Sequence, residues 1–133
     1  MQKLYTKFKS EHHEMYQKLD ETLYILSTLK NKRNDSFLIE AVNNLLFYVE
    51  QLINQHFKEE EEKLFPEIKD SELLKTLLSD HKAITDKYNN LKELLSHFSS
   101  EKDYKKDLLF PSYNLIATIS HHGQREDATI LNQ

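Results

Sequence analysis

The stretch HFKEEEEKLFP, residues 56–66, ends an apolar pattern with helical steps that begins near residue 36. Within it, His56 and Glu60 continue the stripe of positions that also holds Val49 and Leu64. Side chains four residues apart on a helix are rotated by only about 40°, so both polar groups lean toward one region of the core. The proline at the end of the stretch cannot continue a helix and is expected to end it.

Three further segments show the same periodicity, with apolar residues at steps of mostly three, four or seven. The four segments span about residues 3–30, 36–65, 71–98 and 104–131. One glycine and two prolines exclude a fold rich in tight turns. The short connections favour antiparallel neighbours, which predicts an all-α, up-down-up-down four-helix bundle with residues 1–133 as one domain. Pro111 lies inside the last segment, so that helix either kinks there or begins there after a separate turn.

Composition excludes several classes of protein. The chain has 133 residues and no cysteine, which removes disulfides, thiolate metal sites and thiol catalysis. A net charge of −4 gives no basic footprint, so we expect no nucleic-acid partner. No apolar run approaches the roughly 18 residues of a membrane span, and the first residues lack the apolar stretch of a signal peptide. We therefore expect a cytoplasmic protein with no membrane partner.

Polar residues occur where the core should be. Besides His56 and Glu60, the apolar stripes contain His12, His81, His122 and Glu126. One core histidine is more often a satisfied structural residue than a ligand. Two buried carboxylates without partners would cost several kcal/mol each, however, and the stripes hold no lysine or arginine near them. A metal centre resolves this conflict, and two metals resolve it better because two carboxylates can bridge both.

An internal repeat supports the same interpretation. His81 follows His12 at an offset of 69 residues, and His122 follows His56 at an offset of 66. Each half of the chain thus supplies one helix with a histidine and one with a His-x3-Glu pair. Two such helical hairpins facing one another would form a pseudo-symmetric site, with two histidines for each metal and two shared glutamates.

The chain resembles the hemerythrin-like (HHE cation-binding) domains over essentially its whole length. The resemblance rests on the histidine of the first segment and on the stretches HFKEEEEKLFP, SDHKAI and HHGQRED, which follow the order of that family. It implies a four-helix bundle with an oxo- or hydroxo-bridged centre of two iron ions. It also implies a set of six metal ligands, in which the two glutamates bridge: His12, His56, Glu60, His81, His122 and Glu126.

The chain departs from the respiratory hemerythrins in its third helical segment. Those proteins carry His-x3-His there, whereas His81 is followed at that spacing by Thr85. We therefore expect one imidazole fewer and a further coordination position for water, oxygen, nitric oxide or another side chain such as Glu59 or a tyrosine. Their fourth helix carries His-x4-Asp, a spacing that His122 and Asp127 also have. We prefer Glu126 as the ligand, because five helical steps turn Asp127 away from His122.

Three functions agree with these observations. The leading hypothesis is a non-haem di-iron protein that binds, senses or scavenges O2, NO or iron. An enzyme at the same centre, with NO-reducing, peroxide-degrading or iron–sulfur repair activity, is the second, and its electron donor or protein partner is unknown. A metal-free helical interaction module is the third. Manganese or zinc would suit the same nitrogen and oxygen donors.

Some neighbouring residues have simpler interpretations. His13 and His121 fall off the apolar stripes and are interpreted as surface or supporting groups. Gly123 in a helix interior costs about 1 kcal/mol relative to alanine. It either marks a weak point in the helix or leaves room for a small ligand.

Overall fold

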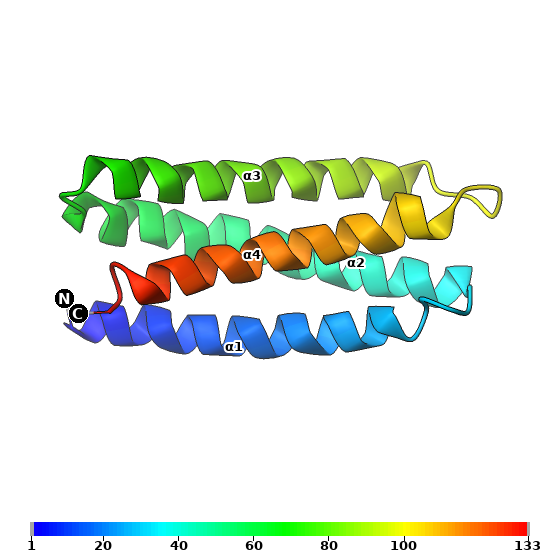
Figure 1. Cartoon of the computed structure of the whole chain (residues 1–133), viewed down its shortest axis with the longest axis horizontal. Coiled ribbons are helices and arrows are strands. Elements are labelled where there is room, and N and C mark those ends of the chain that lie inside the picture. The colour runs from blue at the N-terminus through cyan, green and yellow to red at the C-terminus, as the bar shows by residue number, and fades with distance from the viewer. Residues whose placement is uncertain (1, 133) are drawn as a thin grey trace.

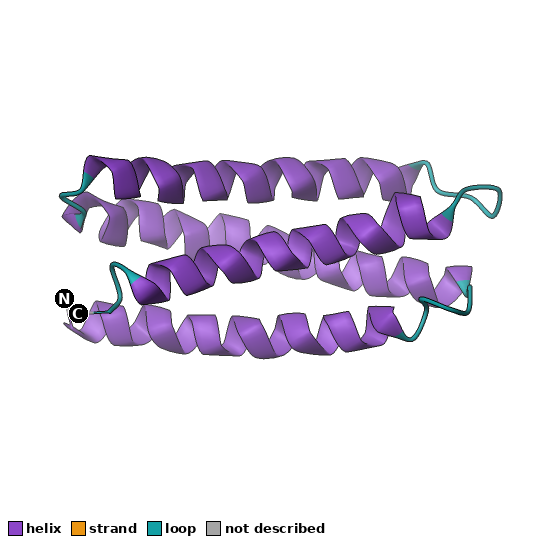
Figure 2. Cartoon of the chain, viewed as in Figure 1, coloured by secondary structure: helices purple, strands orange, loops and turns teal. Residues whose placement is uncertain are grey.

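The computed structural model describes residues 2–132, and over that range the chain consists of helices and short connections (Figures 1 and 2). The long helices are α1 (Gln2–Ser27), α2 (Asp35–Gln51), α3 (Ser71–Ser96) and α4 (Phe110–Ala128). Both α1 and α3 pack against α2 and α4. Successive helices run in opposite directions, as Figure 1 shows, so the predicted antiparallel four-helix bundle is confirmed.

Short polar side chains start three of the four helical segments. Asn34 accepts a hydrogen bond from the backbone N–H of Phe37 before α2. Asp70 accepts from the N–H groups of Glu72 and Leu73 before α3, and Asp103 caps the last segment in the same way. Each cap satisfies backbone donors that have no partner inside the helix. These caps fix where the helices begin, and therefore which residues face the core.

The helix after α2 widens into π-helical turns near the polar residues of the core. These turns are η1 (Leu52–Phe57) and η2 (Glu60–Leu64), followed by the 3₁₀ turn η3 (Phe65–Glu67). A π turn closes hydrogen bonds between residues five apart and changes which side chains face inward. As a result, His56 and Phe57 are both buried although they are consecutive. The helix ends at η3, which contains Pro66, as the proline predicts.

A third π turn precedes Pro111. The turn η4 (Lys105–Leu109) runs directly into α4, whose first turn contains this proline. Proline lacks an N–H group and would clash with the carbonyl of residue i−4 in a regular helix. The wider turn relieves that conflict, and the last segment passes from this turn into α4 at Phe110 with no break between them, so neither a separate turn nor an isolated start at the proline is present.

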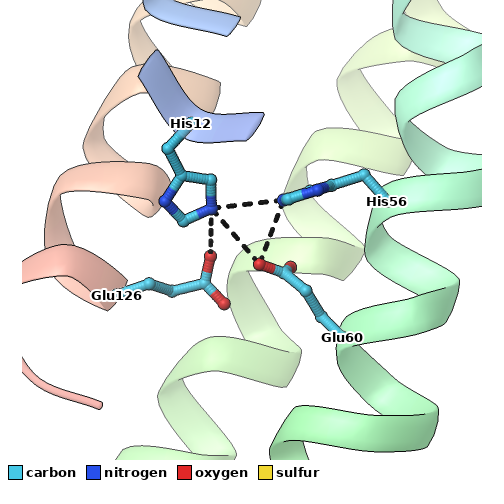
Figure 3. A group of neighbouring side chains, drawn as sticks. All are labelled: His12, His56, Glu60 and Glu126. Carbon is cyan, nitrogen blue, oxygen red and sulfur yellow. Dashed lines mark hydrogen bonds and ion pairs between the residues drawn. The ribbon is translucent and has the colours of Figure 1, made fainter. Parts of the chain in front are cut away.

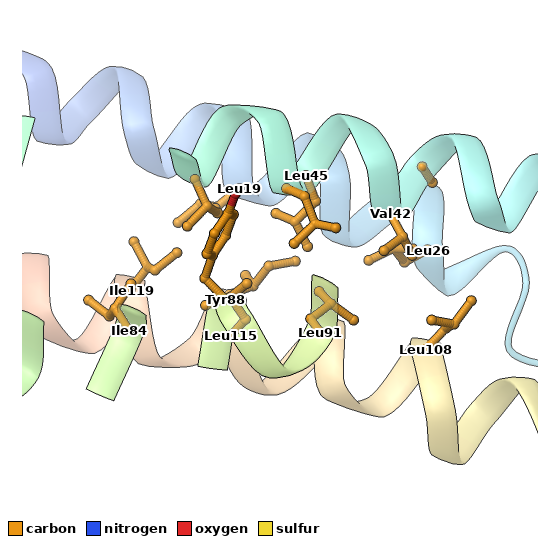
Figure 4. Close-up of a cluster of buried hydrophobic side chains, with 14 of the residues drawn as sticks. Leu19, Leu26, Val42, Leu45, Ile84, Tyr88, Leu91, Leu108, Leu115 and Ile119 are labelled. Carbon is orange, nitrogen blue, oxygen red and sulfur yellow. The ribbon is translucent and has the colours of Figure 1, made fainter. Parts of the chain in front are cut away.

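The apolar core is divided into two clusters. The larger one fills the half of the bundle shown in Figure 4 and includes Leu19, Leu45 and Leu115. The smaller one contains Phe8, Leu64, Phe65, Leu77, Ile130 and Leu131. On α1, His12 lies between Phe8 of the smaller cluster and Met15 of the larger one. The polar residues therefore form a layer between two apolar regions. No described helix is long and apolar enough to cross a membrane.

Candidate metal centre

The structure brings the six predicted site residues together in that polar layer. Each is at most 8% exposed, and Glu60 and Glu126 are fully buried. Their inward-facing atoms form two overlapping groups, each with two histidines, and both groups contain Glu60 and Glu126. The donor atoms within a group all lie within 4.8 Å of one another. Either group can therefore surround one metal ion.

The first group joins α1, η1, η2 and α4 (Figure 3). The Nε2 atoms of His12 and His56 lie 3.2 Å apart. Oε2 of Glu60 lies 3.4 Å from Nε2 of His12 and 3.1 Å from Nε2 of His56. Oε1 of Glu126 lies 3.2 Å from Nε2 of His12. Four donor atoms from different parts of the bundle thus face one point.

The second group consists of His81 on α3, His122 on α4 and the same two glutamates. The Nε2 atoms of His81 and His122 lie 3.0 Å apart. They approach the other oxygen of Glu60, with Oε1 at 2.9 Å from His81 and 3.6 Å from His122. Oε1 of Glu126 lies 3.2 Å from Nε2 of His122. Glu60 therefore presents one oxygen to each pair of histidines, which is the arrangement of a bridging carboxylate.

The environment of the Glu126 carboxylate indicates whether a cation fits this site. Among the described residues, neither of its oxygens has a hydrogen-bond partner, although the side chain is fully buried. Its neighbours within ion-pair distance are the imidazoles of His12 and His122. A buried carboxylate without hydrogen bonds is costly, and bound cations compensate that cost. The donor set of imidazole nitrogens and carboxylate oxygens suits iron, manganese or zinc.

An outer ring of four carboxylates accepts hydrogen bonds from the outward-facing nitrogen, Nδ1, of each of the four imidazoles. Nδ1 of His12 donates to Asp127 at 2.7 Å, and Nδ1 of His56 donates to Glu11 at 2.9 Å. The corresponding partners are Glu61 for His81 (2.8 Å) and Asp80 for His122 (3.0 Å). Each bond fixes the ring orientation and leaves Nε2 free to face inward, as in metal sites where a carboxylate orients a histidine ligand.

These outer carboxylates follow the internal repeat of the sequence. Glu11 and Asp80, which hold His56 and His122, are 69 residues apart. Glu61 and Asp127, which hold His81 and His12, are 66 residues apart. Both offsets are the ones that relate the inner residues. The pseudo-two-fold arrangement predicted for the inner residues thus extends to the ring around them.

Reasoning from the sequence alone missed this outer ring. Each of its members is adjacent in the chain to an inner residue and contacts a histidine on a neighbouring helix. The signal was therefore present as acidic residues beside the site at repeat-related positions. Asp127 was considered only as an alternative ligand, and its contact with His12 gives it an orienting position instead.

The other histidines lie outside the cluster. His13 and His121 are exposed, as their positions off the stripes predict. His97 caps the C-terminus of α3 and is exposed. Of the glutamate run, Glu59 pairs with Lys7 at the surface rather than entering the site.

The carboxylates also favour the charged form of the His12 and His122 imidazoles. Burial lowers the pKa of His12, but its close contacts with the carboxylates of Asp127, Glu126 and Glu60 outweigh that effect and raise the pKa to about 11. Burial likewise lowers the pKa of His122, and contacts with Glu126 and Glu60 raise it to about 10. Burial raises the pKa of Glu60, while its contacts with the four imidazoles hold it well below the usual range. Without a metal, protons on His12 and His122 thus offset buried negative charge.

Fold and site together define a helical bundle with a buried histidine–carboxylate centre suited to cations. The family model of the hemerythrin HHE cation-binding domain matches residues 3–133. The chain therefore belongs to the hemerythrin HHE cation-binding domain family. No curated protein and no solved structure matches it closely enough to be counted as a relative.

The raised histidine pKa values predict how the metal-free protein responds to pH. Because the folded chain binds these protons more tightly than the unfolded chain, their stabilisation is complete below the ordinary pKa of 6.5. It is lost as pH rises through the folded values of about 10 and 11. We expect the free energy of unfolding in chelator to fall between pH 6.5 and 9, as measured by urea denaturation. His122→Gln should flatten this dependence, and an equally steep decline in that variant would contradict the assignment.

Proposed function

We propose that this protein binds two iron ions between Glu60 and Glu126 and uses them to bind, sense or scavenge O2, NO or iron. The observation that carries the proposal is the pair of overlapping ligand groups, because both groups contain the same two glutamates. One oxygen of Glu60 faces His12 and His56, and the other faces His81 and His122. Two ions could thus share this carboxylate while each keeps its own two imidazoles.

The surroundings of the cluster favour a small ligand. The aromatic rings of Phe57 and Phe65 stack on His81, with centroids 4.3 and 5.1 Å away, and Phe8 contacts His56 edge-on. These rings exclude water and large polar molecules from much of the site. A surface pocket of about 500 Å³ between α1 and α2 is bordered by His56 and Glu11. This pocket gives a diatomic molecule or a metal ion a side from which to approach His56.

The residues of the chain would hold, orient and neutralise the ions. Four imidazoles and two carboxylates would bind them, and the outer carboxylates would keep the imidazoles oriented. Bound iron would supply redox activity and a coordination position for O2 or NO. Thr85, at the position of a histidine in the respiratory proteins, offers no imidazole, which supports an open position.

The direct test of this function is an optical spectrum of the iron-loaded protein. We expect the reduced protein to change its spectrum on addition of NO. We also expect it to oxidise within minutes in air without regaining the reduced spectrum under vacuum, because the chain supplies one imidazole fewer than a respiratory carrier. Release of oxygen under vacuum would indicate oxygen storage instead. A spectrum unchanged by both gases would contradict the proposal.

Charge-neutral variants of the shared glutamates test the bridge. Anaerobically reconstituted wild-type protein should contain two irons per chain, magnetically coupled. Glu60→Gln and Glu126→Gln should each retain fewer than about one, because each removes an anionic ligand from both positions. Glu62→Gln, an exposed position in the same glutamate run, is the matched control and should retain two. One iron per wild-type chain would rule out the shared centre, and none would favour the metal-free module.

Adjacent histidines provide a second internal comparison. His12→Ala and His122→Ala should weaken metal binding by more than about 100-fold, since each removes an inner donor rather than an orienting group. His13→Ala and His121→Ala change exposed neighbours and should leave the number of bound ions unchanged. Competition with a chromophoric chelator measures both effects. Equal losses for His12→Ala and His13→Ala would show that the inner donors are wrongly assigned.

A further inference from the structure

The pseudo-two-fold arrangement fails at two pairs of repeat-related positions beside the centre. The residue that the repeat relates to Tyr16 is Thr85, and the residue related to Gly123 is Phe57. The bundle has two halves around the centre, one beside His12 and the other beside His81. The half beside His12 combines a large side chain on α1 with a glycine on α4. The other half combines a small side chain on α3 with a phenylalanine in η1. The large and small positions are exchanged between the halves.

In the first half, Gly123 makes room for the Tyr16 hydroxyl. A β-carbon placed on Gly123 would lie 2.7 Å from Oη of Tyr16 and 2.9 Å from Cε of Met15. Real β-carbons do not make contacts this short, so any larger residue would displace the hydroxyl. The glycine therefore has a packing reason that neither of its two sequence interpretations included: it permits close approach of a tyrosine on α1.

The Tyr16 hydroxyl continues a hydrogen-bonded chain that ends at the inner cluster. It donates to Oδ2 of Asp127 at 2.8 Å. The other oxygen of that carboxylate, Oδ1, accepts from Nδ1 of His12 at 2.7 Å. Nε2 of the same imidazole faces Glu60 and Glu126. With both oxygens engaged, the Asp127 carboxylate is held in one orientation although its side chain is 34% exposed.

The second half lacks this support. Glu61, which the repeat relates to Asp127, accepts from Nδ1 of His81, and its side chain is 47% exposed. Among residues 2–132 it makes no other hydrogen bond, because Thr85 stands where a tyrosine would be needed. His81 is instead held by the stacked rings of Phe57 and Phe65. One half is thus oriented by a polar chain and the other by aromatic packing.

We propose that Tyr16 is a positioning residue for His12, acting through Asp127 in the space that Gly123 leaves. The two metal positions are therefore inequivalent, and the Tyr16 hydroxyl tunes the one bounded by His12 and His56. This inference rests on the proposed two-metal function for its effect on binding. The hydrogen-bonded chain itself involves only residues of the protein, so it can also be tested without metal.

The metal test is titration of the chelator-treated full chain with Co²⁺, followed by visible absorption. We expect two ions to bind to the wild type in two steps, and Tyr16→Phe to weaken one step by about 3- to 10-fold while leaving the other unchanged. Tyr88→Phe removes a hydroxyl from a buried tyrosine on α3 that makes no hydrogen bond to the site, and it should change neither step. Equal weakening of both steps, or of neither, would overturn the inference.

A double-mutant cycle tests the role of Gly123. Gly123→Ala should weaken the same step as Tyr16→Phe, because its methyl group displaces the hydroxyl. Adding Gly123→Ala to Tyr16→Phe should then have a smaller effect on that step than Gly123→Ala has in the wild type, since the contact with the hydroxyl is gone and only those with Met15 and the ring of residue 16 remain. Additive losses would show that the glycine acts independently of the tyrosine and would overturn its assigned role.

A metal-free measurement separates this inference from the proposed function. Proton exchange at Nδ1 of His12, followed by NMR of ¹⁵N-labelled protein in chelator, should be faster in Tyr16→Phe than in the wild type or Tyr88→Phe. An unchanged exchange rate would overturn the inference whether or not metal binds. The wild type could bind no Co²⁺ while Tyr16→Phe still accelerates proton exchange at Nδ1 of His12. In that case the two-metal proposal fails and the positioning of His12 by Tyr16 stands.

Discussion

Two fully buried carboxylates, Glu60 and Glu126, impose the strongest constraint on this bundle. Ionised carboxylates in an apolar core are unfavourable unless cations or protons compensate them. Within the described residues, their ion-pair partners are the four imidazoles and include no lysine or arginine. The helices must therefore present histidines at one level, and this level separates the two apolar clusters. Family membership and the geometry of the cluster point to cations as its ligands.

The constraint extends outward in ordered steps. Imidazoles that face the carboxylates need their outer nitrogens satisfied, and four acidic side chains from neighbouring helices provide this. The repeat relates these contacts in pairs, which is consistent with two similar hairpins meeting face to face. The repeat is broken at Tyr16 and Gly123, where the outer carboxylate Asp127 meets the surrounding packing. Two similar sets of inner residues thus have different environments.

Much of the fold and the position of the cluster could be predicted from the sequence, for reasons visible in particular residues. Glycine and proline are so scarce that helical periodicity is easily recognised, and His12 or Glu126 stands out inside an apolar stripe. The contact of Asp127 with His12 and the space above Gly123 could not be predicted in this way. They depend on how α1 and α4 approach each other, and on side-chain directions that one helix does not determine. The sequence pattern also did not predict the π turn η1, in which His56 and Phe57 are both buried.

The central claim is that two metal ions lie between Glu60 and Glu126. Anomalous diffraction at the iron absorption edge from crystals of the iron-loaded protein tests this claim most directly. We expect two peaks about 3.5–4 Å apart, one beside His12 and His56 and the other beside His81 and His122. A single peak within the cluster, or peaks only at surface carboxylates, would contradict it.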